Sequence, residues 1–322
     1  MVFSYKKILC LLAVSFAATA SYAEWPDRPV TLVVPYSAGG GTDATARIIA
    51  SMLKDSLGTP VNVVNRPAGG GVVGQEAIAG AKPDGYTIGL VSAETFMNHN
   101  LGLTQRTEKD YTALALMNSD PSAVIVSATS PYKNMGDLIK AIKANPGKLK
   151  SSGTGTGGVW NLAMAGMLDS MGIPSDAVRW VPSAGAAPAM LELVAGGVDF
   201  VPVSLPEARA MIDSGKAVPL AVMAPNPVAL YPKVPTLKMA TGSDWIASAW
   251  RGMVAPAGLP AEVLKKYEAA LNTINHSEKY RDFMKNQGYE VVYMNSPDFG
   301  KFMVDGNIST GKIMSKLGLT KK

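Results

Sequence analysis

The sequence predicts an α/β fold in which parallel β-sheets are covered by helices. Short runs of aliphatic and β-branched residues alternate along the chain with stretches whose apolar residues recur at helical spacing. Glycine-rich loops repeatedly follow a predicted strand and precede a predicted helix, an order typical of such sheets. The chain has 322 residues, which is long enough for two domains rather than one hydrophobic core.

The first predicted strand covers residues 31–35 and leads through a glycine-rich loop into a helix over residues 43–57. Apolar residues mark one face of that helix: Ala46, Ile49, Ala50, Leu53 and Leu57. Later strands are predicted over residues 61–65, 87–92, 123–127, 179–182, 200–204 and 219–223. Later helices are predicted over residues 135–143, 159–171 and 187–195, with another that ends near residue 81.

The C-terminal part has a different pattern, with an amphipathic helix predicted over residues 260–274. A last helix is predicted to begin at Ser296, since a serine followed by Pro297 and Asp298 is a typical helix start. No glycine- and serine-rich linker separates the two halves of the chain. Two domains would therefore be joined by ordinary strands that cross between them twice.

The first 23 residues have the pattern of a signal peptide. Lys6 and Lys7 precede a short apolar stretch over residues 8–18, and Ser21-Tyr22-Ala23 has small residues where a signal peptidase reads them. Cleavage is expected before Glu24. An N-terminal membrane anchor is the alternative, and the cleavage pattern disfavours it. Cleavage would also remove Cys10, the only cysteine, so the mature chain would have no disulfide and no thiol for catalysis or metal binding.

Composition and charge exclude several classes of protein. Apolar residues make up 47% and charged residues 17% of the chain, which is typical of a globular protein and excludes wholesale disorder. The formal net charge is +5, and removal of the two lysines in the signal peptide leaves +3. Basic residues are adjacent only in pairs, so the clustered positive charge of a nucleic-acid-binding protein is missing.

Four loops of small residues are candidate anion-binding sites. They cover residues 35–43, 66–71, 151–158 and 183–188, and each joins a predicted strand to a predicted helix. Backbone N–H groups at a helix N-terminus attract anions, and glycine allows a ligand to approach them closely. Loops at the carboxyl ends of parallel strands are also where ligands bind in α/β sheets. The alternative is that the small residues only form tight turns.

Residue types that would indicate catalysis are scarce. Residues 39–44 fit the dinucleotide pattern G-x-G-x-x-A, but the next predicted strand ends in Asn65 rather than in an acid that could bind a ribose. His99 and His276 lie far apart, without the spacing of a metal site or a catalytic triad. We therefore expect no enzymatic activity, no cofactor and no metal.

Three residues have two interpretations each. Asp43 either caps the first helix or orients a ligand. Trp160 either faces a ligand or packs in the core, because it has helical spacing to Met164. Arg251, on a strand expected to cross between the domains, either contacts a ligand or is solvated.

A series of short motifs runs along the mature chain: WPDRP at 25–29, VPYSAGGGTDATAR at 34–47, NRPAGG at 65–70, PDGYT at 83–87, NPG at 145–147, AAPA at 186–189, GGVD at 196–199, VPT at 234–236 and VAPAG at 254–258. In these motifs, and over essentially all of its mature length, the chain resembles the Bug extracytoplasmic solute receptors, the substrate-binding proteins of tripartite tricarboxylate transporters. This resemblance implies a periplasmic binding protein-like fold, with residues 24–125 and 246–322 in one lobe, residues 126–245 in the other, and a ligand cleft between them.

The resemblance also implies that backbone amides and ordered waters hold a small carboxylate in the cleft. The implied ligand-binding residues are Tyr36, Ser37, Ala38, Gly39, Gly40, Thr42, Asp43, Ser92, Thr156, Gly157, Trp160, Gly185, Ala186, Ala187 and Ser204. Two departures occur. Gly158 and Asn161 stand where the family often has serine and histidine, and Asn226-Pro227-Val228 stands where an arginine is usual.

The function expected from these observations is that of a monomeric periplasmic receptor that delivers a small carboxylate to membrane subunits of a transporter. One alternative keeps the same binding fold but has the liganded protein act on a sensor kinase. Another is a secreted α/β hydrolase, which the lack of a nucleophile–base pair disfavours. The sequence does not distinguish dicarboxylates, tricarboxylates, aromatic acids and amino acids as ligands.

Overall fold

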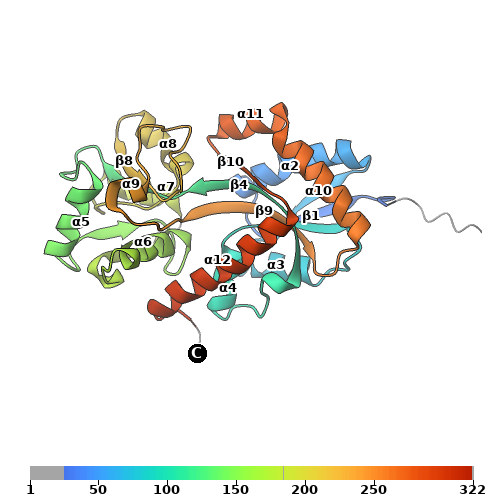
Figure 1. Cartoon of the computed structure of the whole chain (residues 1–322), viewed down its shortest axis with the longest axis horizontal. Helices are drawn as coiled ribbons and strands as arrows, with labels where there is room; N and C mark the ends of the chain where they lie inside the picture. Colours follow the sequence, from blue (N-terminus) through green and yellow to red (C-terminus); the bar gives the residue numbers. More distant parts are fainter. Residues whose placement is uncertain (1–24, 184, 321–322) are drawn as a thin grey trace, which may run out of the picture.

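The computed structural model describes residues 25–183 and 185–320, and its elements form two lobes (Figure 1). The predicted signal peptide and Cys10 lie outside the described residues. Among the described residues, no helix has both the length and the apolar character needed to cross a membrane.

The larger lobe contains a six-stranded sheet with the order β10-β4-β9-β3-β1-β2. The bounds of its strands are β1 Val30–Val34, β2 Val61–Asn65, β3 Thr87–Val91, β4 Tyr111–Pro121, β9 Ser248–Pro256 and β10 Val291–Met294. β1 pairs parallel with β2 and β3, as predicted. The expectation of purely parallel sheets is wrong, because β9 runs antiparallel to both β3 and β4, and β10 runs antiparallel to β4.

Helices cover the sheet of the larger lobe (Figure 1). They are α2 Gly41–Leu57, α3 Val72–Ala79, α4 Glu94–Asn100, α10 Ala261–His276, α11 Glu278–Gln287 and α12 Ser296–Lys316, with a 3₁₀ turn η1 at Glu108–Asp110. The apolar face predicted for the first helix packs on the sheet, where Ala46, Ile49 and Leu53 are fully buried. Burial of this stripe on the strands is what fixes the direction of α2 and the place of its N-terminus.

The smaller lobe contains two short sheets surrounded by helices. Its strands are β5 Ala123–Ser127, β6 Lys150–Ser152, β7 Arg179–Val181 and β8 Ala217–Val222; its helices are α5 Met135–Ala144, α6 Val159–Ser170, α7 Ala186–Val194, α8 Leu205–Asp213 and α9 Leu237–Thr241, with a 3₁₀ turn η2 at Ser175–Ala177. β5 pairs antiparallel with β8, and β6 pairs parallel with β7. The strand predicted over residues 200–204 is not regular and forms only isolated bridges, such as that between Val201 and Ile125.

Two long strands, β4 and β9, run between the lobes, and we call them the crossing strands (Figure 1). They pair antiparallel from Tyr111 opposite Pro256 to Pro121 opposite Ser248. β5 begins two residues after β4 ends, so the lobe boundary expected at residues 125/126 falls within a strand of the smaller lobe. The expected boundary at residues 245/246 falls just before β9.

A third connection is made by α12, whose C-terminal end packs against α6 of the smaller lobe. Buried side chains of both helices belong to one apolar cluster, which includes Ile313 and Met314 of α12 and Leu162 of α6. Lys316 and Asp169 add an ion pair at 2.7 Å. The lobes are therefore held by apolar contact as well as by the crossing strands.

Candidate functional site

The loop between β1 and α2 presents an open helix N-terminus. The N-cap of α2 is Gly40, with φ −79° and ψ 170°, and no side chain accepts a hydrogen bond there. The predicted residues Ser37, Ala38, Gly39 and Gly40 are all exposed. A Cβ built on Gly40 would meet only the Ser37 carbonyl oxygen, at 3.6 Å. The first N–H groups of α2 are thus accessible to an anion.

Asp43 holds this loop in place through hydrogen bonds. Its buried carboxylate accepts hydrogen bonds from the Gly39 N–H, from Arg47 Nε and from Asn65 Nδ2, each at 2.9 Å. Burial alone would raise the pKa of Asp43, but these donors outweigh it and lower the pKa below its usual value. Since Gly40 is the N-cap, the interpretation of Asp43 as the cap is wrong, and Asp43 instead fixes the shape of the loop before the helix.

The helices α6 and α7 of the smaller lobe begin in the same way as α2. Their N-caps are Gly158 and Gly185, neither has a side-chain cap, and neither helix has an acid in its first turn. Gly185 has φ 142°, which favours glycine. By contrast, α5, α9 and α11 begin at Asn134, Thr236 and Ser277, whose side chains accept backbone hydrogen bonds.

The two loops before α6 and α7 lie side by side. The Ser183 N–H and the Trp180 Nε1–H both donate to the Thr154 carbonyl oxygen, at 3.0 and 3.2 Å. Thr156 and Ala187 are exposed on these loops, whereas Gly157 and Ala186 are buried and Gly185 is half-buried. The structure therefore brings the candidate residues before α6 close to those before α7.

Two residues near the start of α6 are buried in the structure. Asn161, one of the departures from the family pattern, accepts a hydrogen bond from the Gly157 N–H at 2.9 Å and so fixes this turn. Trp160 is 2% exposed and belongs to the core of the smaller lobe together with Met164. Core packing accounts for its position, and a contact between Trp160 and a ligand stays a prediction.

Tyr36 and Ser92 connect the first loop with the end of β3. The Tyr36 hydroxyl donates to Glu94 Oε2 at 2.9 Å, and Glu94 is the first residue of α4. Burial raises the pKa of Tyr36 well above its usual value, and the Glu94 carboxylate raises it further. Ser92 is buried, and it lowers the pKa of Tyr36 against these two effects. Glu94 is a side chain at the site that the sequence did not single out.

Ser204 belongs to the N-terminus of α8 in the smaller lobe. It forms a capping box with Glu207, whose Oε2 accepts from the Ser204 hydroxyl at 2.7 Å and from the Ser204 N–H at 3.3 Å. Burial raises the pKa of Glu207, although Ser204 and the positive charge of Arg251 oppose the shift. The signal in the sequence was S-x-x-E before a helix, but nothing in it placed Glu207 near Arg251.

Arg251 on β9 is the centre of a buried polar network. It is 9% exposed, so the interpretation of a solvated arginine is wrong. Its Nη1 donates to Asp120 Oδ2 at 2.7 Å and to Asn118, and its Nε donates to Thr42 at 3.2 Å. Its guanidinium lies over the ring of Tyr289 at 4.8 Å. Arg251 thereby joins both crossing strands to the N-terminus of α2.

Segments from both lobes meet around the crossing strands. Tyr36 of the first loop donates to Glu94 at the start of α4, Arg251 donates to Thr42 in α2, and Ser204 at the start of α8 forms a bridge with Ser122 just after β4. The starts of α4 and α6 line one apolar cavity of about 150 Å³ through Ala93 and Val159. The structure thus links the N-termini of α2, α4, α6 and α8 at the junction of the lobes.

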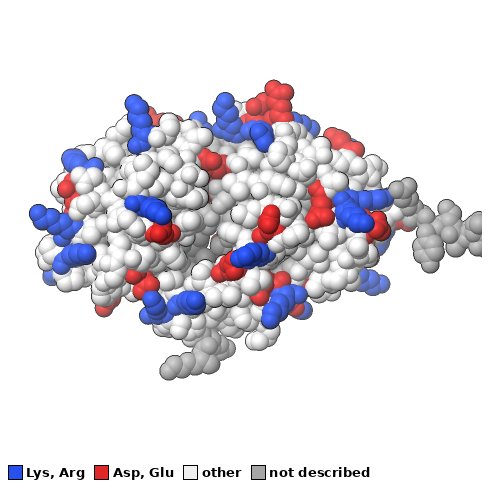
Figure 2. Space-filling view, viewed as in Figure 1, with Lys and Arg blue, Asp and Glu red and all other residues white. Residues whose placement is uncertain are grey.

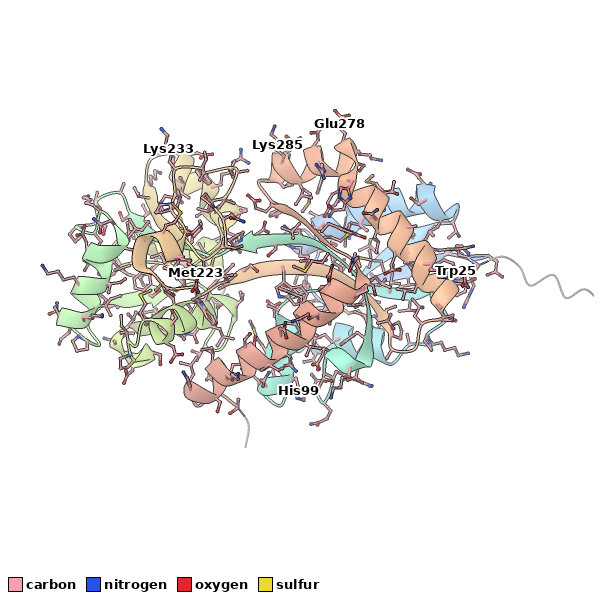
Figure 3. The ribbon with its side chains drawn as sticks, viewed as in Figure 1. Trp25, His99, Met223, Lys233, Glu278 and Lys285 are labelled. Atoms are coloured by element: carbon pink, nitrogen blue, oxygen red, sulfur yellow. The ribbon has the colours of Figure 1, made fainter. Side chains whose placement is uncertain are left out.

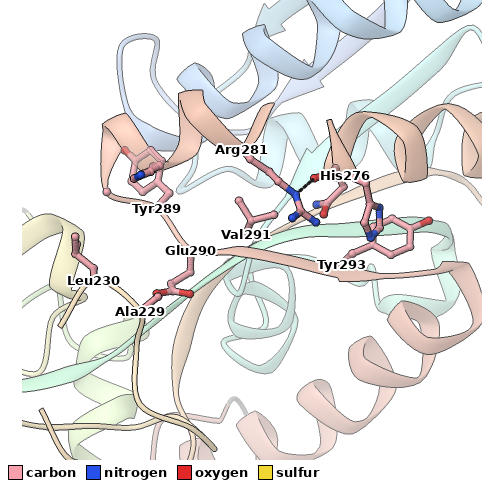
Figure 4. Close-up of a pocket in the computed structure, with 11 residues that line it drawn as sticks. Ala229, Leu230, His276, Arg281, Tyr289, Glu290, Val291 and Tyr293 are labelled. Atoms are coloured by element: carbon pink, nitrogen blue, oxygen red, sulfur yellow. Dashed lines mark hydrogen bonds between the residues drawn. The ribbon is translucent and has the colours of Figure 1, made fainter. Parts of the chain in front are cut away.

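A larger cavity, of about 580 Å³, is lined in part by Tyr289 (Figure 4). Ala229 and Leu230 of the smaller lobe form one wall, and the other is formed by the end of α10, by α11 with Arg281, by β10 and by Glu290 in the turn before β10. Arg281 Nε donates a hydrogen bond to the Asn275 carbonyl oxygen at 3.3 Å. None of the residues predicted from the sequence lines this cavity, so its size alone does not make it the candidate site.

The face of the molecule drawn in Figure 2 shows no concentrated patch of charge. Figure 2 shows lysine and arginine side chains scattered among acidic ones over this face of the molecule. Among the described residues, no three metal-ligating side chains of histidine, cysteine, aspartate or glutamate come together. Two lobes joined by two crossing strands, with helix N-termini gathered at their junction, define the class of two-domain periplasmic binding proteins.

The comparisons identify the family within this class. Residues 45–319 match the tripartite tricarboxylate transporter family receptors, TctC. A protein of Bordetella pertussis from the group designated UPF0065 is 31% identical over 98% of each chain. A TctC solute-binding protein from Polaromonas has a TM-score of 0.82 at 33% identity, over 91% of this chain and 99% of that one. This chain belongs to the TctC receptor family, and the resemblance to Bug receptors is confirmed.

Further solved structures agree with this assignment. The periplasmic binding protein BugD has a TM-score of 0.74 at 28% identity, over 92% of this chain and 100% of that one. Two proteins of Rhodopseudomonas palustris share the fold at 24% identity: MatC with bound malate, at a TM-score of 0.72, and a protein with adipate, at 0.76. They cover 90% and 92% of this chain, and 99% of each of their own. The family is one of periplasmic solute-binding receptors and not of enzymes.

Proposed function

We propose that this protein is an exported receptor that binds a small carboxylate between its lobes and delivers it to the membrane subunits of a tripartite transporter. It catalyses no reaction and acts as a monomer. The observation that carries the proposal is that helices of both lobes, α2 in the larger and α6 and α7 in the smaller, begin at glycine without any side-chain cap, as α3 also does.

These helix ends supply the positive potential that a carboxylate needs. Each helix N-terminus acts as about half a unit charge, and its free N–H groups point at an anion that approaches along the axis. No lysine or arginine occurs over residues 35–43 or 151–159. The nearby Arg251 already pairs with Asp120 at 2.7 Å. Backbone N–H groups, together with the hydroxyls of these loops, are therefore the main donors that we expect a ligand to use.

Closure of the lobes would bring the two sets of loops onto one ligand. The larger lobe offers Tyr36 to Asp43 and Ser92, and the smaller lobe offers Thr156, Gly157, Trp160, Gly185, Ala186, Ala187 and Ser204. A ligand that contacts both lobes favours the closed arrangement over the open one. The malate and adipate in the two R. palustris relatives support a small carboxylate as the ligand class.

A thermal-shift screen against small carboxylates tests this function. We expect a carboxylate that binds with a dissociation constant in the micromolar range, or about −8 kcal/mol. At a hundredfold excess over that constant, binding adds about 2.7 kcal/mol to the free energy of unfolding. Sugars and cations serve as controls, and the proposal fails if they raise the melting temperature while a broad set of acids leaves it unchanged.

Export is tested by the N-terminus of the mature protein. We expect mass spectrometry of the periplasmic fraction to find a chain that begins at Glu24, because the small residues Ser21 and Ala23 precede that bond. A chain in the cytoplasm that retains Met1, or that begins at Val2, would contradict the proposed localisation.

A further inference from the structure

The cavity of about 580 Å³ that Tyr289 lines takes no part in the proposed function (Figure 4). Its size suits a small molecule, since ligand pockets usually enclose about 300–1,000 Å³. Ala229 and Leu230 of the smaller lobe form one wall, and α10, α11 and β10 of the larger lobe form the other. The C-terminal end of α11 also lies close to α8 of the smaller lobe, because a Cβ built on Gly288 would be 3.1 Å from Arg209 Nη1. A molecule held in this cavity would therefore contact both lobes.

Two cationic side chains of α11, Arg281 and Lys285, line the cavity. They are four residues apart, so they share one face of the helix. Arg281 donates to the Asn275 carbonyl oxygen through Nε alone, and neither cation forms an ion pair within the described part of the chain. Figure 3 shows Lys285 at the end of α11 that faces the smaller lobe. Glu290 is the only acid among the lining residues, so the cavity has an excess of positive charge and favours an anion.

The other walls of the cavity are largely apolar or aromatic. Leu230 is 37% exposed, and Val291 on β10 is half-buried. Tyr293 is also half-buried, and its ring packs edge-on against His276 with the ring centres 5.4 Å apart. Tyrosine rings pack well against another aromatic ring, and the terminal nitrogens of an arginine match the two oxygens of a carboxylate. The lining therefore suits a flat aromatic ring that bears a carboxylate.

Tyr289 connects this cavity with the open end of α2. Its side chain lines the cavity, and its hydroxyl oxygen would lie 2.5 Å from a Cβ built on Gly41, the first residue of α2. Arg251 lies over the Tyr289 ring at 4.8 Å and donates to Thr42 in the first turn of α2. A molecule that moves Tyr289 would therefore act on the helix end at which we propose that the transported carboxylate binds.

We propose that this cavity is a second binding site, for an aromatic carboxylate. The carboxylate of that molecule accepts hydrogen bonds from the terminal nitrogens of Arg281 and pairs with Lys285, while its ring lies against Tyr293 and Leu230. Because the walls belong to both lobes, the bound molecule biases the arrangement of the lobes and changes the affinity of the interlobe site. The second site is independent of the proposed function, and only its effect on the interlobe site rests on that function.

Calorimetric titration of Gly40→Val with benzoate and phenylacetate tests the second site, because this variant removes the proposed backbone contact of the interlobe site. We expect at least one of the two acids to bind with a dissociation constant below about 1 mM. Benzyl alcohol keeps the ring and acetate keeps the carboxylate, and each should bind at least about tenfold more weakly. If neither aromatic acid binds, or if either control binds as tightly, the proposal is wrong.

Arg281→Gln and Lys285→Gln locate the site. Both side chains are exposed, so the fold should be retained. Arg281→Gln should weaken the binding of the aromatic acid at least about tenfold and Lys285→Gln about threefold, since arginine offers two parallel hydrogen bonds and lysine a point charge. Lys279→Gln is the matched control, because Lys279 is an exposed lysine of α11 that does not line the cavity. Equal binding by Arg281→Gln and the unsubstituted protein, or an equal loss in Lys279→Gln, would overturn the assignment to this cavity.

The effect on the interlobe site is measured in the protein with Gly40 intact. At saturation with the aromatic acid, the dissociation constant of the aliphatic acid that gives the largest thermal shift should change at least about threefold. Arg281→Gln should remove this change, whereas direct competition for the interlobe site would persist in that variant. No change, or the same change in both proteins, would refute the coupling. If no aliphatic acid binds, the proposed function fails, while the titration of Gly40→Val still decides whether the second site exists.

Discussion

Gly40→Val is expected to abolish carboxylate binding while the protein remains folded. A valine side chain at the N-cap of α2 would occupy the space through which a ligand reaches the first N–H groups of the helix. Loss of those charge-assisted hydrogen bonds should weaken binding at least about a hundredfold, or about 2.7 kcal/mol. Calorimetric titration with the acid that gives the largest thermal shift measures the effect.

The fold should tolerate this change because Gly40 is exposed. Its φ of −79° is open to any residue, and a Cβ there meets only the Ser37 carbonyl oxygen, at 3.6 Å. The free energy of unfolding should change by less than about 1 kcal/mol. Gly300→Val is the control. Gly300 lies in α12 rather than in the first loop, and a Cβ built on it would meet only the Ala113 Cβ, at 3.8 Å. Normal binding by folded Gly40→Val would refute capture by the α2 backbone.

Arg251→Ala should instead destabilise the protein, by about 3–5 kcal/mol. The change leaves the Asp120 carboxylate, whose side chain is 1% exposed, without its positive partner. It also removes the donor to Thr42 and the cation over Tyr289. Urea denaturation measures the loss. As a control, Lys238→Ala removes one member of an exposed pair, Lys238–Asp244, and should cost less than about 1 kcal/mol.

The loss caused by Arg251→Ala should depend on pH. Burial raises the pKa of Asp120 even beside Arg251, and removal of the guanidinium raises it further. A carboxyl group with a raised pKa in the folded state stabilises at low pH and loses that contribution as pH rises. The variant should therefore be less impaired at about pH 5 than at about pH 8. An equal loss at both values would show that Asp120 is not the group left unpaired.

Because Arg251 stabilises the fold, the effect of Arg251→Ala on ligand affinity has two possible causes. A weaker ligand affinity in Arg251→Ala could arise from displacement of Thr42 and the α2 N-terminus, to which Arg251 donates at 3.2 Å. Gly40→Val acts on the same helix end without touching the buried network. If Gly40→Val binds normally and Arg251→Ala does not bind, an arginine–carboxylate clamp would replace capture by the backbone.

The sequence by itself determined the features that depend on neighbours along the chain. The helix over residues 43–57 follows from the spacing of Ala46, Ile49 and Leu53, and α2 covers it. The glycines before α2, α6 and α7 predict open helix ends, and the structure has them as N-caps without side-chain partners. These properties need only local periodicity and local backbone freedom, which the order of residues contains.

Only the tertiary structure decided which side chains meet at the junction of the lobes. Arg251 reaches Asp120, 131 residues away, because β4 and β9 pair antiparallel in one particular register. Glu94 reaches Tyr36 across the end of β3, and Ser204 at the start of α8 forms a bridge with Ser122 just after β4. A shift of one residue in strand register would turn Arg251 to the opposite face of the sheet. Register is set by the packing of the whole core, so no local pattern in the sequence could have placed these charges together.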